Sequence, residues 1–237
     1  MPSTSEKTFG QLYTKGRELV EYIKTIPTYS PGNPDIEAHA LTTLLDNIES
    51  ANSDASSKLS SLQTERDARL ILYKNRETGM IAKSSQIRDY IASIDPKGKK
   101  ALDFKKLQKL VQRMRGIRLS KKPVPPEGGG GPKTISTSEK SFGSLLAVGK
   151  ELLEVIKTVP GYAPSNTSLT VADFTAFLDS IDTKNSLVAQ KLEEYDNSVE
   201  ARRSFYDVLK ERVQKVKLAL AAQFGKTSNE YKDALRY

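Results

Sequence analysis

The sequence predicts an all-helical protein made of two tandem antiparallel three-helix, coiled-coil-like bundles joined by a Pro/Gly linker. Apolar residues recur at alternating spacings of three and four over long stretches, a pattern typical of helices that pack along a seam. The chain also matches itself at a shift of 133 residues. Hydrophobic residues make up only 37% of the chain and Trp is absent, so two slender bundles fit the composition better than one large core.

The internal match indicates a tandem duplication. Residues 3–73 align with 136–206 without a gap, and about two-fifths of the aligned positions are identical. Beyond this stretch the register shifts by four residues, because repeat 1 has extra residues around Asn75–Gly79, which predict a turn. We therefore expect three parts: residues 1–120 as module 1 with an extra basic helix, 121–135 as a flexible Pro/Gly linker, and 136–237 as module 2.

The first helix of each module is predicted to begin at a capping box, Ser3 with Glu6 and Ser136 with Glu139. It should end before a proline, which removes a backbone donor. The apolar seam contains a glycine in both copies, and we expect a neighbouring helix to approach closely there. The two seams are Phe9, Leu12, Gly16, Leu19, Ile23 and Ile26, and Phe142, Leu145, Gly149, Leu152, Ile156 and Val159.

The second helix is predicted to be long, and it is preceded by Asn33 with Pro34 in repeat 1 and by Thr170 with Asp173 in repeat 2 as capping residues. One polar position interrupts its seam in both copies, at Asn52 and Asn185. A buried Asn commonly sets the register or number of partner helices, so these two residues are candidate specificity positions. The seams are Leu41, Leu45, Ile48, Asn52, Ala55, Leu59, Leu62, Arg66, Arg69 and Tyr73, and Phe174, Leu178, Ile181, Asn185, Val188, Leu192, Tyr195, Val199, Arg202 and Tyr206.

A third helix is expected to close each bundle. Its apolar stripe is Met80, Ile87, Ile91 and Ile94 in repeat 1, and Leu209, Val213, Val216, Leu220 and Phe224 in repeat 2. If a stripe stays uncovered, the modules must pair with each other or with another chain.

Repeat 1 continues into a basic segment. A helix capped by Asp103 should bury Phe104, Leu107, Val111 and Met114 and end at Gly116. Eleven basic residues stand against one acidic residue, whereas the whole chain has a net charge of +8. They are Lys97, Lys99, Lys100, Lys105, Lys106, Lys109, Arg113, Arg115, Arg118, Lys121 and Lys122. The segment could bind nucleic acid, lie on an anionic membrane surface, or be a solvated face docked on module 1.

The chain resembles a family of short bacterial all-helical proteins of unknown function, here as a tandem duplication. The resemblance lies in the Ser-Thr-Ser start, the Ile-Pro-x-Tyr-x-Pro-x-Asn loop, the stretch Leu72–Gly79 and the Phe-Gly-x-x-Ser-x-x-Tyr-Lys tail at 224–232. Repeat 1 departs from it, with Asp95–Gly98 where the Phe-Gly tail would fall, and repeat 2 lacks the Thr-Gly turn. The resemblance implies a helical fold and no particular activity or site.

Composition argues against most catalytic chemistry. Cys is absent and His39 is the only histidine, which excludes thiolate zinc sites, cysteine nucleophiles, histidine metal clusters and a Ser-His-Asp set shared by both repeats. Arg69 and Arg202 could bind an anion, or extend their stems along the seam to solvent or a carboxylate. Tyr29 and Tyr162 could stack on a ligand, or close the end of the bundle. We predict no enzyme, no metal and no cofactor.

The functional hypothesis is a non-enzymatic structural, scaffolding or protein-interaction protein that acts through the surfaces of its helical bundles. The alternative is a nucleic-acid-binding accessory protein that uses the basic segment at 97–122. A protein partner or self-association is expected, nucleic acid is possible, and a small-molecule ligand is not expected. Without a basic-then-apolar start or an apolar run of about eighteen residues, we expect a cytoplasmic protein without a membrane span.

Overall fold

The computed structural model describes residues 4–116 and 141–237, with side chains from Phe9 onward, and every regular element in these ranges is helical, which confirms the all-helical class. The capping-box side chains and the linker at 121–135 lie outside the described side chains and residues. The predicted start of a helix at Ser136 is wrong for α5, which begins at Phe142 with Ser141 as its N-cap. The elements are α1 (Thr4–Lys24), η1 (Pro34–Ile36), α2 (Ala38–Lys74), α3 (Met80–Ile94), η2 (Gly98–Lys100), α4 (Leu102–Met114), α5 (Phe142–Lys157), η3 (Thr167–Leu169), α6 (Val171–Phe224) and α7 (Asn229–Ala234).

Local polar contacts confirm some of the predicted helix ends, but the predicted Asp103 cap is wrong. Helix α4 begins at Leu102 without a side-chain cap, and Asp103 lies inside its first turn, where its carboxylate accepts from Lys106. The Asn33 side chain accepts a hydrogen bond from the backbone N–H of Asp35 and caps η1, which leads into α2. The expected turn after α2 is confirmed, because Asn75 Oδ1 accepts from the backbone N–H groups of Glu77 and Thr78. Gly79 completes this turn, and a Cβ there would lie 2.6 Å from the Asn75 carbonyl oxygen.

Repeat 2 has no such turn, and the expected separate third helix is wrong. Its apolar stripe from Leu209 to Leu220 lies on α6, which runs unbroken from Val171 to Phe224. The sequence of α6 contains neither Gly nor Pro, so nothing in it interrupts the helix.

The compact units of the chain do not follow the repeats. Unit 1 comprises residues 1–62 and 191–237, and unit 2 comprises residues 63–190. The expected modules 1–120 and 136–237 would each keep one repeat together. Instead, each unit combines the first part of one repeat with the last part of the other.

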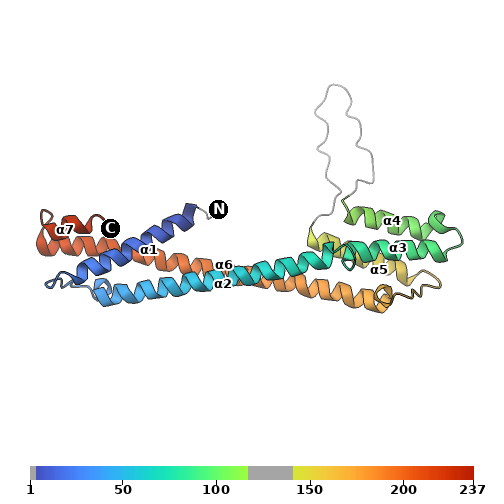
Figure 1. Ribbon diagram of the computed structural model, residues 1–237, viewed down its shortest axis with the longest axis horizontal. Helices are drawn as coiled ribbons and strands as arrows, with labels where there is room; N and C mark the ends of the chain where they lie inside the picture. The colour runs from blue at the N-terminus through green and yellow to red at the C-terminus, as the bar shows by residue number, and fades with distance from the viewer. Residues whose placement is uncertain (1–3, 117–140) are drawn as a thin grey trace, which may run out of the picture. The chain divides into compact units, whose positions relative to one another are not determined.

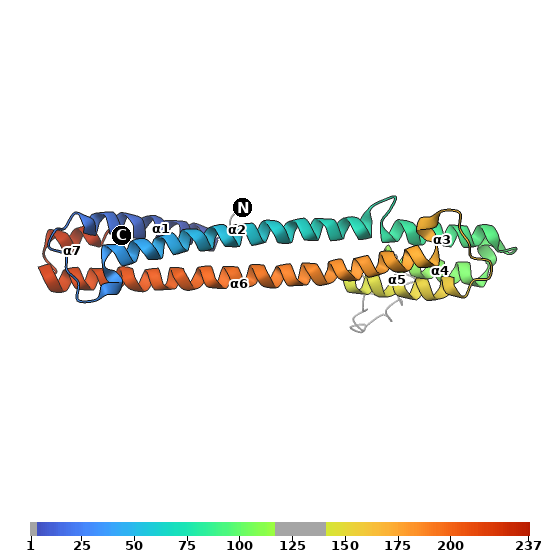
Figure 2. The same cartoon turned by 90° about the horizontal axis from the view of Figure 1, so that it is seen from below.

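Unit 1 has a core made by α1, the first part of α2, the last part of α6, and α7 (Figure 2). The seam glycine of α1 lies where three helices meet, because a Cβ on Gly16 would be 3.2 Å from the side chains of both Leu45 and Leu209. The expected close approach is therefore confirmed. Helix α7 contacts α1, since the Tyr22 hydroxyl donates to the Glu230 carbonyl at 3.0 Å.

Unit 2 repeats this arrangement with α5, the first part of α6, α3 and α4 (Figure 1). A Cβ on Gly149 of α5 would be 2.9 Å from Leu178 on α6 and 3.0 Å from Met80 on α3. The basic helix α4 packs on α3 and α5. Its buried face is Phe104, Leu107, Leu110, Val111 and Met114, which includes all four residues predicted for it. Helix α4 thus lies against α5 as α7 lies against α1.

Candidate functional site

Each seam asparagine makes a hydrogen bond to a buried tyrosine of the other repeat. The Nδ2 group of Asn52 donates to the Tyr206 hydroxyl at 3.0 Å in unit 1. In unit 2, Nδ2 of Asn185 donates to the Tyr73 hydroxyl at 2.9 Å. Both tyrosines are fully buried, and Tyr73 in turn donates to the Phe142 carbonyl at 2.7 Å. Because buried polar groups need partners, these bonds favour one alignment of the two helices.

The same tyrosines pack on the phenylalanine near the start of the other repeat's first helix. Phe9 stacks on Tyr206 with ring centroids 4.5 Å apart, and Phe142 lies 4.9 Å from Tyr73. The Arg69 guanidinium covers the Phe142 ring at 4.0 Å, and burial lowers its pKa. This seam arginine therefore packs on an aromatic ring of its own unit.

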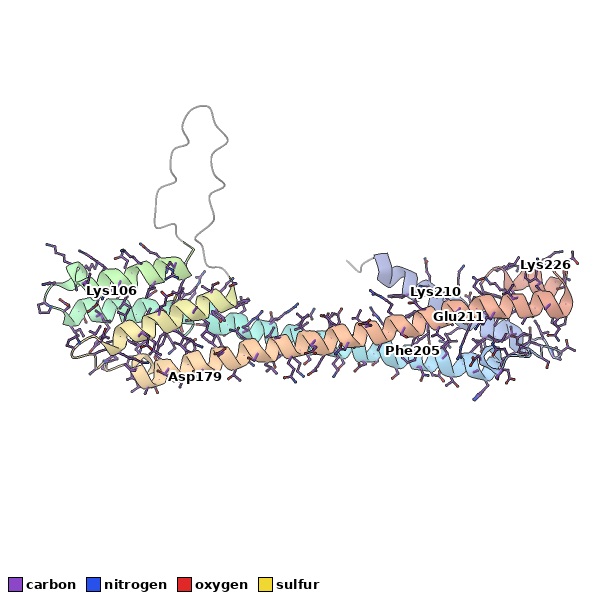
Figure 3. All side chains as sticks on the ribbon, turned by 180° about the vertical axis from the view of Figure 1, so that it is seen from behind. Lys106, Asp179, Phe205, Lys210, Glu211 and Lys226 are labelled. Atoms are coloured by element: carbon purple, nitrogen blue, oxygen red, sulfur yellow. The ribbon has the colours of Figure 1, made fainter. Side chains whose placement is uncertain are left out.

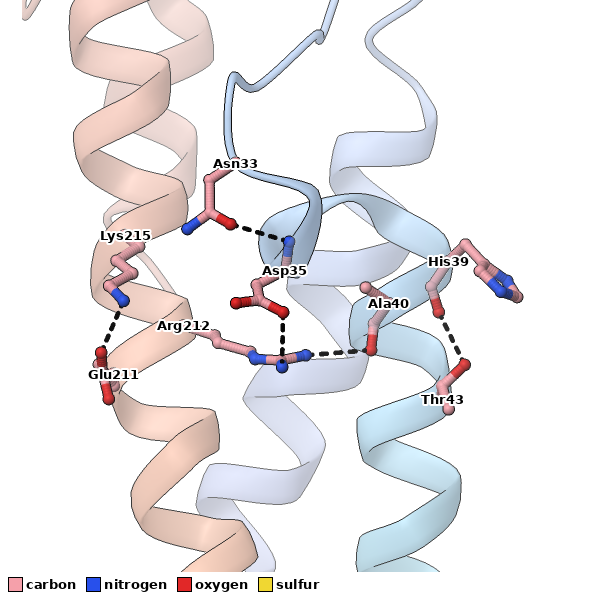
Figure 4. A network of polar contacts seen from close by, with 8 residues as sticks. All are labelled: Asn33, Asp35, His39, Ala40, Thr43, Glu211, Arg212 and Lys215. Carbon is pink, nitrogen blue, oxygen red and sulfur yellow. Dashed lines mark hydrogen bonds and ion pairs between the residues drawn. The ribbon is translucent and has the colours of Figure 1, made fainter.

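A cation of one repeat also reaches the loop before the second helix of the other. Arg212 pairs with Asp35 at 3.0 Å and donates to the Ala40 carbonyl at 3.4 Å (Figure 4). In unit 2, the buried Lys83 donates to the Ser168 carbonyl at 3.2 Å, and desolvation lowers the pKa of its ammonium group. Sequence reasoning missed this pair. Lys83 and Arg212 occupy equivalent positions of the two repeats once the four-residue shift is applied. This equivalence of two cations was the sequence signal for the shared contact.

The loop tyrosines close the ends of the units. The Tyr29 hydroxyl donates to the Ile36 carbonyl at 2.9 Å, and the Tyr162 hydroxyl donates to the Leu169 carbonyl at 2.6 Å. Burial raises the pKa of both phenols to about 12. Their hydroxyls are thus engaged with backbone on the inner side of the loop, as the structural interpretation expected.

The basic segment splits into paired and unpaired charges. Lys106 pairs with Asp103 at 3.1 Å and is labelled in Figure 3, and Arg115 donates to the Ser85 hydroxyl at 2.8 Å. Five exposed lysines make no ion pair within residues 9–116 and 141–237. They are Lys97, Lys99, Lys100, Lys105 and Lys109. The remaining predicted residues, Arg118, Lys121 and Lys122, lie outside the described residues.

Arg113 differs from the lysines around it. Its guanidinium makes two hydrogen bonds to the Glu151 carboxylate, at 2.6 and 3.4 Å, and thereby joins α4 to α5. The sequence grouped Arg113 with the basic residues that could contact nucleic acid, but it is half-buried and ion-paired. It belongs to the packing of α4 on α5.

A groove between the first and second helices of a repeat occurs in both units, and sequence reasoning missed it. In unit 2 it has a volume of about 510 Å³ between α5 and α6. In unit 1 the volume is about 140 Å³, because Tyr13 fills part of it and donates to Glu49 at 3.2 Å. Six equivalent pairs of residues line both grooves: Arg17 and Lys150, Val20 and Leu153, Glu21 and Glu154, Thr42 and Thr175, Leu45 and Leu178, and Asp46 and Asp179.

The described residues offer neither a metal site nor a membrane-spanning helix. No group of three His, Asp or Glu side chains there could hold a metal ion. Within the same residues, no helix is both long and apolar enough to cross a membrane. Comparison of the chain with known proteins finds no matching family, no matching curated protein and no matching solved structure.

The buried asparagine–tyrosine contact gives a prediction about stability. Tyr73→Phe leaves the Asn185 amide without its acceptor, and Asn185 Oδ1 is already buried without a hydrogen-bond partner. We expect a loss of about 1–2 kcal/mol in the free energy of unfolding, measured by chemical denaturation. Asn185→Leu in the Tyr73→Phe background should recover stability, because it removes the orphaned amide.

The matched control is Tyr13→Phe, whose hydroxyl bonds to Glu49 in an exposed position. That change should leave stability within about 0.5 kcal/mol of the parent. An equal, small effect for Tyr73→Phe and Tyr13→Phe would contradict the role of the buried contact.

Proposed function

We propose that this chain is a non-enzymatic interaction and scaffolding protein that binds a helix of a partner protein in the groove of unit 2. The groove between α5 and α6 supports the proposal. Its lining includes the exposed Ala147 and two leucines of the core, Leu153 and Leu178, which are both buried. Its volume is about 510 Å³.

The charges around the groove indicate the chemistry of the partner. Three carboxylates, those of Glu151, Glu154 and Asp179, stand beside one cation, Lys150. Glu151 and Glu154 are already paired with cations of unit 2, and Lys150 is paired with Asp182. Asp179 is exposed and makes no ion pair within the described part of the chain (Figure 3). A partner helix with an apolar ridge flanked by Lys or Arg would fit this surface.

The equivalent groove in unit 1 supports a scaffolding function. Asp46, which corresponds to Asp179, is also exposed and has no ion pair in the described residues. Tyr13 narrows this groove, so we expect the same kind of basic amphipathic helix to bind there more weakly. The duplication would then present a strong and a weak site for one kind of helix.

The proposal is tested with a synthetic amphipathic helix. A peptide with a Leu ridge flanked by Lys is titrated into the full chain, and a peptide with Glu at the Lys positions is the control. We expect backbone amide shifts at 147–154 and 175–179 with the Lys peptide only, and smaller shifts at 17–24 and 42–46. Asp179→Lys should weaken binding several-fold, because it reverses the unpaired charge, while Asp196→Lys elsewhere on α6 should not.

Two results would overturn this proposal. One is equal binding of the Lys and Glu peptides, which would remove the role of the acidic rim. The other is binding that shifts residues outside both grooves, or no binding at all.

Nucleic-acid binding through unit 2 is the second candidate function. The five unpaired lysines support it, because all are exposed and follow one another along the chain: Lys97 just before η2, Lys99 and Lys100 in η2, and Lys105 and Lys109 on α4. A surface of this kind contacts phosphates, and its affinity comes mainly from the release of counterions. Arg113 is excluded from this surface because it is paired with Glu151.

The test is a salt-dependent binding assay with duplex DNA. Changing Lys100, Lys105 and Lys109 together to Gln should weaken binding for all sequences and flatten the log–log salt dependence, by about 0.9 per lost phosphate contact. The melting temperature should be unchanged, because exposed cations contribute little to stability. The control changes Lys24, Lys210 and Lys226 of unit 1 to Gln. No binding even at low salt, or an equal effect of both triple variants, would rule this candidate out.

A further inference from the structure

The contacts that hold unit 1 together are repeated in unit 2 with the roles of the two repeats exchanged. In unit 1, repeat 1 supplies the first helix with Phe9 and repeat 2 supplies Tyr206. In unit 2, repeat 2 supplies Phe142 and repeat 1 supplies Tyr73. The asparagine–tyrosine bonds and the cation–loop contacts follow the same exchange. In each unit, the first half of one repeat therefore packs against the last half of the other repeat.

Neither half of a unit keeps a hydrophobic core without the other. In unit 1, Leu19 and Ile23 of repeat 1 are buried in the same cluster as Leu209 and Val216 of repeat 2. Burial of such apolar side chains is a main source of the stability of a folded protein. Separating the halves would expose both stripes at once.

We infer that the repeat is self-complementary, so that the partner which fits its first half is the last half of a second copy of the repeat, in the same chain or in another. The two halves approach each other closely at the seam glycine, where a Cβ atom would lie 3.0–3.2 Å from a side chain of the other half. Gly16 meets Leu209 and Gly149 meets Met80, so in each unit the seam glycine packs on the side chain at the equivalent position of the other repeat. Pairing of repeat 2 with repeat 2 would place Gly149 against Leu209, which is the combination of residue types already present in unit 1. This inference does not depend on the groove proposal.

The inference is tested on the full chain after one cut. A protease site replaces Gly128–Gly131, in the Pro/Gly segment between the repeats. After cleavage, the two fragments should elute together in size-exclusion chromatography at the volume of the intact chain. The reason is that the core of each unit contains side chains from both fragments. The cut protein is then unfolded in denaturant, refolded by dilution and analysed by native mass spectrometry. We expect pairs of two repeat-2 fragments beside the original mixed pairs.

Matched glycine variants show whether the new pairs use the same contacts. Gly149→Val should reduce the proportion of pairs between two repeat-2 fragments at least several-fold, because it fills the site of close approach. Gly143→Val is the control, since a Cβ at that exposed position meets nothing within 4 Å. Circular dichroism of both uncut variants separates loss of pairing from loss of folding.

Three results would overturn the inference. The cut fragments could separate as folded monomers, which would show that each repeat completes its own core. The refolded sample could contain mixed pairs only, which would show that the fit is specific to unlike repeats. Alternatively, the two glycine variants, both folded when uncut, could reduce the pairs between repeat-2 fragments equally.

Discussion

The unbroken course of α6 is the constraint on which the rest of the structure depends. From Val171 to Phe224 the sequence has no Gly or Pro, and the apolar stripe continues through Tyr206 into Leu209 and Leu220 without a break. A helix without a turn cannot fold its last part back onto its own first part. The stripe beyond Tyr206 must therefore be covered by other helices, and α1, the first part of α2 and the short α7 share its core.

The same polar contacts between the repeats recur in both units. A fully buried tyrosine with a hydrogen bond from an asparagine of the other repeat occurs in both units, and so does a cation that reaches the opposite loop. The two candidate binding surfaces both involve unit 2. The Arg113–Glu151 ion pair connects the basic helix α4 to the rim of the groove, so a partner in the groove and an anion on α4 would affect the same pair of helices.

Most seam positions and some caps could be predicted from sequence because they depend on local spacing, although Arg66, Ile94 and Leu192 are exposed. Gly16 and Gly149 on apolar stripes indicated close helix contacts, and Asn33 with Pro34 indicated a helix start. The pairing of stripes could not be predicted in this way, because a stripe shows which face is buried but not which helix covers it. The absence of Gly and Pro between 171 and 224 was the signal against a folded-back third helix. In the same way, spacing placed Arg113 beside Lys109 on α4, but only the fold brings Glu151 to it.

The central claim is that each core is shared between the repeats, and the aromatic rings near the asparagine contacts test it most directly. Nuclear Overhauser effects between selectively labelled Phe and Tyr rings report pairs that are only a few ångströms apart. The account predicts cross-peaks between Phe9 and Tyr206 and between Phe142 and Tyr73, whose ring centroids are 4.5 and 4.9 Å apart. Cross-peaks between Phe9 and Tyr73 and between Phe142 and Tyr206 would contradict it, because each repeat would then fold on itself.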